Sequence, residues 1–278
     1  MAGTPNPVES PQPRRFAHLR ILAMPKLLAR ALPYIVVAVG LKAICEAADV
    51  HPLDLNPLLS GLVAANVFLL GFLLAGTLGD YKEAEKLPGE LAGALETICD
   101  EALLVHQEKG IPEGAACVKQ CADVAGAIRG YIVRESDVTP VLDAIRAFNP
   151  IFLVFGPAIQ PGFTTRLKGE QAGIRRAIIR IDTIRTTTFV NAGYAIAELT
   201  GVLLIVGLEL TKVADKTVES LFFVGVITLL LTYVFLLIRD LDNPFAYPKG
   251  VEGAADVSLL PLIAAEARLR AEYDALAD

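Results

Sequence analysis

The sequence has no tryptophan and only three histidines in 278 residues, and it lacks the short motifs that mark most enzymes. There is no GxSxG, HExxH or Walker-type loop, and the three histidines lie far apart in the chain. We therefore expect neither an enzyme nor a bound cofactor. The net charge of −6 likewise argues against a nucleic-acid partner.

Charged residues are nearly absent from four apolar stretches of the chain. Hydrophobic residues make up 54% of the whole chain. These stretches cover residues 31–45, 58–78, 189–208 and 221–238. A helix rises about 1.5 Å per residue, so about 20 residues cross the roughly 30 Å hydrocarbon core of a bilayer. The pattern predicts an all-α membrane protein with four transmembrane helices, of which the first is the shortest and carries Lys42.

Lysine and arginine flank these stretches unevenly. Residues 14–30 hold several basic side chains, whereas the loop 46–56 has none, and further basic residues follow 80 and 238. By the positive-inside rule, both termini and the long middle segment lie in the cytoplasm. The expected order is a cytoplasmic tail with an interfacial helix (1–30), two spans (31–79), a helical cytoplasmic region (80–188), two spans (189–240) and a cytoplasmic C-terminal segment (241–278).

The cytoplasmic region shows helical periodicity and no β pattern of any length. We expect helices over 81–106, 113–133 and 137–147, the last capped by Asp137 or Thr139. Residues 148–163 are apolar but rich in proline and glycine, so a buried connector is favoured over a segment that dips into the membrane. A helix over 165–194 is expected to run directly into the third span, and another helix to lie within 257–276.

Four cysteines offer little for a disulfide or a metal, since only Cys45 is expected near the outer face. Cys117 and Cys121 share a helix face, but His106 is the only histidine nearby. Small buried apolar side chains are the favoured interpretation, and we predict no metal site.

The second span offers a candidate pore surface. Ala64, Phe68 and Phe72 recur at i, i+4 and i+8 and so share one face. Several copies around an axis would form apolar rings, which gate by dewetting. Spacing alone favours the alternative, in which the two phenylalanines pack against neighbouring spans.

Polar residues inside the spans are further candidates, because ionisable groups in a membrane are often functional. Glu198 has a role in the pathway, faces the aqueous interface or bonds a neighbouring helix, and Asn66 either faces a pore or bonds a neighbouring helix. Lys42 is a candidate partner for Glu198, at a depth that does not match it. Six basic residues precede the third span: Arg166, Lys168, Arg175, Arg176, Arg180 and Arg185. They form either a stripe that attracts anions or touches lipid headgroups, or a solvated face paired with Glu170 and Asp182.

Several short motifs together resemble the bestrophin family of pentameric ion channels, or a divergent relative. Phe68, Leu70, Gly71 and Phe72 match the F-x-L-G-F element of its pore helix, and residues 83–89 resemble an E-A-R-K-L-W-G run. Residues 181–186 are similar to the N-T-L-R-T element that precedes the third span. Residues 243–245 repeat N-P-F after the fourth span, and 257–260 repeat V-S-L-L. The order and spacing extend over nearly the whole chain.

The resemblance implies a homopentamer whose neck consists of Ala64, Phe68 and Phe72. It also implies a second, cytoplasmic constriction near Ala172, with Ile174 as the nearest large apolar residue. Animal members bind calcium at an acidic cluster after N-P-F. Such sites need several oxygen ligands, and here Ala246 and Tyr247 follow, so we expect no calcium activation of that kind.

These patterns favour a homo-oligomeric, chloride-type anion channel whose partners are its own copies, membrane lipids and permeating ions. The basic residues before the third span favour anions, whereas the acidic outer loop 46–54 favours cations. A cation-conducting or weakly selective channel is therefore one alternative. The other is a non-conducting membrane scaffold that binds a partner through its cytoplasmic helices.

Overall fold

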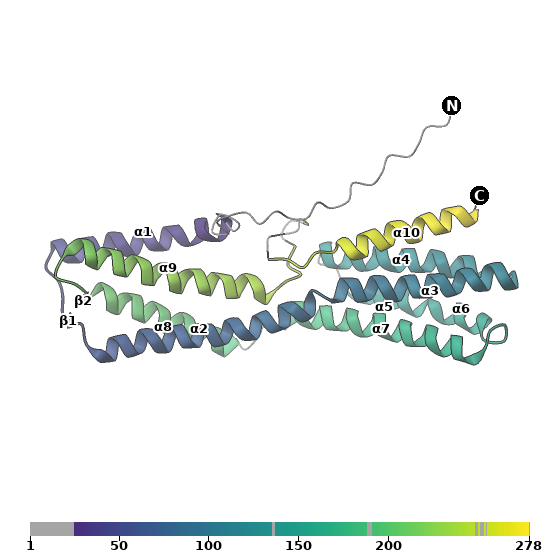
Figure 1. The fold of residues 1–278 in the computed structure, drawn as a ribbon, viewed down its shortest axis with the longest axis horizontal. Helices are drawn as coiled ribbons and strands as arrows, with labels where there is room; N and C mark the ends of the chain where they lie inside the picture. The colour runs from purple at the N-terminus through teal and green to yellow at the C-terminus, as the bar shows by residue number, and fades with distance from the viewer. Residues whose placement is uncertain are drawn as a thin grey trace, which may run out of the picture.

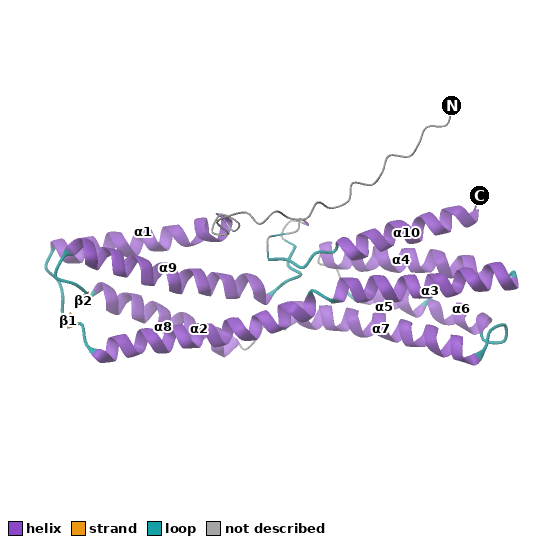
Figure 2. Ribbon diagram, in the orientation of Figure 1, coloured by secondary structure: helices purple, strands orange, loops and turns teal. Residues whose placement is uncertain are grey.

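The protein is an elongated bundle of helices in the computed structural model, which describes residues 25–134, 137–187, 191–247, 250, 253 and 255–277. Figures 1 and 2 show two groups of helices placed end to end, with the chain crossing between them where α2 meets α3. We call the group at one end the membrane bundle and the other group the head. The tail expected over 1–24 lies outside the described residues.

The membrane bundle consists of four long helices and a very short pair of strands. The helices are α1 (Pro25–Ala47), α2 (Pro57–Ala84), α8 (Asn191–Glu209) and α9 (Thr217–Asp242). At the end far from the head, the distal end, β1 (Leu53–Asp54) pairs in parallel with β2 (Thr211–Lys212), with Leu53 opposite Thr211. This pairing joins the α1–α2 loop to the α8–α9 loop.

Three described helical stretches are long and apolar enough to cross a membrane. They are Leu27–Ala47, Pro57–Lys109, which takes in α2 and α3, and Thr217–Asp242. They correspond to the first, second and fourth predicted spans. The third predicted span corresponds to α8, an apolar helix of 19 residues.

The head contains the other six helices. They are α3 (Leu87–Lys109), α4 (Glu113–Arg134), α5 (Thr139–Arg146), α6 (Phe148–Phe155), α7 (Pro161–Thr186) and α10 (Leu260–Ala277). One apolar cluster extends through all six and includes fully buried Leu95, Ile128 and Phe152. The prediction of a helix over 113–133 is confirmed, and Cys117 and Cys121 are buried in this core.

The segment 148–163 is a buried connector only in part, because Leu153 is 79% exposed and Phe163 is 42% exposed. Its first half is α6, whose Phe148, Phe152 and Phe155 are all buried in the head. The rings of Phe148 and Phe152 stack with centroids 5.5 Å apart. The predicted cap of α5 is wrong: the N-cap residue is Val138, which makes no side-chain cap hydrogen bond, although Asp137 just before it accepts a hydrogen bond from the Thr139 backbone N–H at 3.3 Å.

Two of the predicted helices have wrong boundaries. Residues 81–84 end α2 rather than begin the next helix, and a turn at 85–86 separates α2 from α3. Pro88 explains the break, because proline has no backbone N–H and fits only the first turn of a helix. The helix predicted over 165–194 begins earlier, at Pro161, and ends at Thr186, where Thr187 is extended (φ −111°, ψ 115°). Successive β-branched residues are poor helix formers and favour this end.

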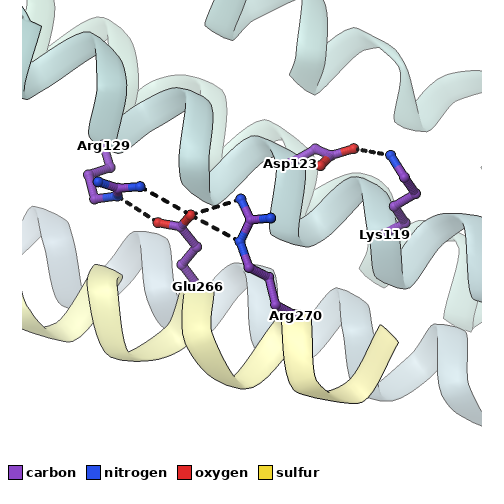
Figure 3. A network of polar contacts seen from close by, with 5 residues as sticks. All are labelled: Lys119, Asp123, Arg129, Glu266 and Arg270. Carbon is purple, nitrogen blue, oxygen red and sulfur yellow. Dashed lines mark hydrogen bonds and ion pairs between the residues drawn. The ribbon is translucent and has the colours of Figure 1, made fainter. Parts of the chain in front are cut away.

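A buried carboxylate holds α10 against α4 (Figure 3). Glu266 is 6% exposed and accepts hydrogen bonds from Arg129 Nε at 2.7 Å and from Arg270 Nη2 at 3.0 Å. Gly126 permits this approach, since a Cβ there would lie 3.1 Å from Glu266 Oε1. Burial alone would raise the pKa of Glu266, but the hydrogen bonds from the two arginines outweigh it and the pKa lies below the ordinary glutamate value.

Candidate functional site

The α2 face that carries Ala64, Phe68 and Phe72 is open in the single subunit. Phe68 is 77% exposed and Phe72 65% exposed, and Ala64 is also exposed. The opposite face of α2 buries Leu70 and Leu73 in a cluster shared with α8 and α9. The two phenylalanines therefore do not pack against the other spans of their own subunit, which was the alternative favoured by spacing alone.

A second open face lies on α7. Its exposed or half-buried residues include Ala172, Arg176, Ile179 and Thr183, whose spacings of four, three and four residues place them on one side of the helix. Ile179 is 50% exposed. The other sides of α7 pack against α3, α5 and α6.

Ile174 does not lie on that face, which corrects its prediction as a constriction residue. Its side chain is fully buried in the core of the head. Only two residues separate it from Ala172, so it lies on a different side of the helix. The large apolar residue that shares a face with Ala172 is Ile179, seven residues further on. Sequence distance from Arg185 placed the predicted constriction near Ala172, but it could not say which side of the helix was covered.

An ion-pair cluster joins the two helices that carry these faces. Arg180 of α7 donates to both carboxylate oxygens of Glu83, at 2.9 and 2.7 Å, and lies 3.6 Å from Asp80. Glu83 and Asp80 belong to the last turns of α2. In Figure 1, α2 and α7 follow one another along the same long edge of the molecule, at the bottom of the view.

The basic residues before the third span do not form one stripe. Arg166 pairs with Glu101 of α3 at 2.8 Å, and Arg185 lies over the Tyr131 ring with its guanidinium carbon 4.7 Å from the centroid. Lys168 donates to Asn149 at 2.6 Å. The partners predicted for these residues, Glu170 and Asp182, are not the ones used. None of the described carboxylates forms an ion pair with Arg175 or Arg176.

Asn66 bonds a neighbouring helix. Its Nδ2 donates to Thr200 Oγ1 on α8 at 2.7 Å, and the residue is 3% exposed. Thr200 in turn donates to the Ile196 carbonyl at 2.7 Å, so its oxygen is free to accept from Asn66. The interhelical alternative for Asn66 is therefore the one that the structure supports.

Glu198 is exposed and lies away from the phenylalanine face. It lines a cavity of about 180 Å³ between α1, α8 and α9, together with Tyr34, Asn66 and Arg239. Because the cavity reaches Asn66, it opens on the buried side of α2. Phe68 and Phe72 do not line it.

Lys42 pairs with Glu46 and not with Glu198. The lysine is fully buried, and its Nζ lies 3.3 Å from Glu46 and donates to the Thr211 carbonyl at 2.6 Å. Ser220 of α9 donates to the same carboxylate at 2.7 Å. The i, i+4 spacing of Lys42 and Glu46 is the signal that could have revealed this pair in the sequence.

Two of the short motifs meet in space. Residues 243–245 follow α9 directly, and Phe245 is fully buried in the core of the head. The Val257 backbone N–H donates to the Pro244 carbonyl at 2.8 Å, and the Tyr247 hydroxyl donates to the Val257 carbonyl. The N-P-F and V-S-L-L motifs thus build the connection through which α9 leads into α10.

Comparison with known proteins gives matches at the level of structure only. No known family model matches the sequence, and no curated protein matches it. A crystal structure of a bacterial bestrophin homolog from Klebsiella pneumoniae is 16% identical, with a TM-score of 0.70 over 90% of this chain and 98% of that chain. A crystal structure reported as that of a membrane protein is 15% identical, with a TM-score of 0.73 over 90% of this chain and 99% of that chain.

The match extends over nearly the full length of both chains, so it includes the membrane bundle and the head together. At this level of identity it establishes the fold. The apolar helices of the bundle agree with it. The chain is an all-α membrane protein with the fold of a bacterial bestrophin homologue.

Proposed function

We propose that the chain is one subunit of a homopentameric ion channel, with a hydrophobic neck formed by Ala64, Phe68 and Phe72 of α2. The observation that carries this proposal is the exposure of both phenylalanines on a helix whose opposite face is buried. The bestrophin-like fold supports it, because the pore helix of that family is the second span. Five such faces around an axis would enclose a narrow apolar passage that expels water.

The α7 face would continue the pathway beyond the neck. Ala172 and Ile179 share this face, and the Arg180–Glu83 pair fixes α7 to the end of α2. A side chain that narrows this part of the pathway must be exposed in the subunit. Ile179 meets that condition and Ile174 does not. We therefore propose Ala172 and Ile179 as the residues that line the second constriction.

In the membrane, α1, α2, α8 and α9 would be the four spans, with the head and both termini in the cytoplasm. The support is the distribution of Lys and Arg in the sequence. Apolar side chains on the outer surfaces of the bundle, such as Val36, Val37 and Phe222, are more than 60% exposed. Lipid and the neighbouring subunits would cover them.

We propose anions, chloride among them, as the permeating ions. The acidic loop that favoured cations is partly neutralised, because Glu46 is bound to buried Lys42. On α7, two arginines have no carboxylate partner among the described residues. A cation-conducting or weakly selective channel is the alternative, and the sign of the reversal potential distinguishes the two.

The experiment is a recording of purified protein in planar bilayers under a potassium chloride gradient. The variant Phe68→Ala, Phe72→Ala should conduct more than the natural protein, since smaller side chains leave the neck wide enough to stay hydrated. Phe222→Ala is the matched control, because Phe222 is a 63% exposed phenylalanine on α9 rather than α2. It should leave conductance unchanged.

The oligomer mass should be measured on the same preparations. A pentamer that conducts, with conductance raised only by the α2 substitutions, supports the proposal. A monomer or dimer that stays silent even after both α2 substitutions would instead indicate a membrane scaffold.

A further inference from the structure

Arg176 differs from the other arginines of α7. Arg166 and Arg180 are bound to Glu101 and Glu83, and Arg185 lies over the Tyr131 ring. Arg176 is exposed, and none of the described residues forms an ion pair with it. Arg175 also lacks an ion pair, but it is half-buried.

Arg176 shares the open face of α7 with Ala172 and Ile179. It follows Ala172 by four residues and precedes Ile179 by three, so the three side chains lie on successive turns of one side. Arg175 lies about 100° around the helix from Arg176, because an α-helix has 3.6 residues per turn. Two adjacent arginines therefore differ in the surface that they present.

None of the described carboxylates near this face forms an ion pair that would neutralise the charge of Arg176. It borders a groove of about 490 Å³ between α3 and α7, together with Glu83, Glu90 and Glu170. Glu83 is already bound to Arg180. Glu170 lines the same groove, six residues before Arg176, but forms no ion pair with it. Glu90 is exposed on α3, on the other side of the groove.

We propose that Arg176 is the residue that gives the pathway its preference for anions. This inference rests on the proposed function. In a pentamer, five copies of Arg176 would form a ring between the turns of Ala172 and Ile179. Rings of arginine or lysine side chains select anions, because they concentrate anions locally and repel cations. The ring would act just beside the apolar constriction, where the passage is narrow and screening by salt is least.

The test measures the reversal potential under a potassium chloride gradient, in the Phe68→Ala, Phe72→Ala background that is expected to conduct well. Arg176→Gln should lower the chloride-to-potassium permeability ratio by on the order of tenfold. Arg176→Glu should lower it further and favour potassium, whereas Arg176→Lys should keep the natural ratio. Arg175→Gln is the matched control and should change nothing.

Two results would overturn the inference without affecting the channel itself. One is an unchanged reversal potential in Arg176→Gln, and the other is an equal shift in Arg175→Gln. Absence of current in every variant, including the background, would overturn the proposed function and this inference with it. A gel-filtration profile that matches the natural oligomer shows that each variant is folded.

Discussion

The head and the membrane bundle bury their apolar side chains to very different extents. In the head, one cluster contains 34 of the described buried residues, whereas the bundle has one cluster of eight and another of three. Between 17% and 28% of each candidate span is buried inside the subunit. The head thus buries a large apolar core within one chain, whereas the bundle leaves most of the apolar surface of its spans exposed.

This difference separates side chains that stabilise the fold of the chain from side chains that the proposed channel would use at its pore and contacts. Phe152 of α6 and Phe68 of α2 are the same residue type, yet one is 1% exposed and the other 77%. Polar groups within the head also differ in how they are used. Glu266 fixes α10 on α4, whereas Arg176 on the open face of α7 has no ion-pair partner among the described residues. Substitutions in the two regions should therefore affect different measurements.

The largest expected effect comes from a phenylalanine in the head. Phe152→Ala should lower the free energy of unfolding by about 3–5 kcal/mol, because it removes a buried ring and leaves a cavity. Thermal or denaturant unfolding of the solubilised protein would measure it. The same substitution at Phe68 should change stability far less, since that ring is not packed within the subunit. Equal losses of stability at the two positions would contradict the comparison.

A substitution at the distal end of the membrane bundle should lower the stability almost as much. Lys42→Met removes a fully buried cation from half-buried Glu46 and from the Thr211 carbonyl, which should lower the free energy of unfolding by about 3 kcal/mol. The melting temperature in detergent would show the loss. Adding Glu46→Gln to this variant should restore part of it, because the uncompensated charge is then removed. If the double variant were less stable than Lys42→Met alone, the pairing argument would fail.

A smaller effect is expected where α10 meets α4. Glu266→Gln should cost about 1–2 kcal/mol, since two charged hydrogen bonds are weakened and both arginines are about half exposed. The pKa of Glu266 is lowered in the folded protein, so its contribution is present at neutral pH and is lost as the pH falls through that pKa, below about 4.3. The stability difference between natural protein and variant should shrink over that range in an acid titration of unfolding. A difference that stays constant down to pH 3 would argue against this ionisation.

The smallest effect is expected at a different ion pair, on the surface of α4. Lys119 and Asp123 form an ion pair at 2.7 Å, but both side chains are well exposed (Figure 3). Asp123→Asn should leave the unfolding transition unchanged, because water and salt already screen this pair. The same unfolding experiment would reveal any shift. A loss of stability as large as that of Glu266→Gln would show that burial does not decide how much each ion pair contributes to stability.

Much of the fold was predictable, because the spacing of apolar residues indicates a helix within a short stretch of sequence. The apolar stretches 31–45, 58–78 and 221–238 coincide with α1, α2 and α9, and the period of residues 113–133 coincides with α4. The short motifs predicted a bestrophin-like arrangement at an identity at which no family model matches. The boundaries at 85–86 and 187 were missed, since a helical pattern continues on both sides of each break.

The candidate site was also predictable from the sequence only in part. Periodicity places Ala64, Phe68 and Phe72 on one face, and spacing places Lys42 within reach of Glu46. Neither property says which face a neighbouring helix covers. Ile174 and Ile179 have the same chemistry and lie on the same helix, but one is buried and the other is half exposed.

The amino-acid sequence by itself determined the helices, the membrane-spanning character of the chain and the residues that share a helix face, because these depend on composition and on a period of 3.6. Only the tertiary structure decided which of those faces remain open, because burial and pairing depend on segments that are distant in sequence. Arg180 meets Glu83 across 97 residues, and Arg129 meets Glu266 across 137. Phe68, Phe72 and Arg176 remain exposed, and no local pattern in the sequence records which faces such distant contacts cover.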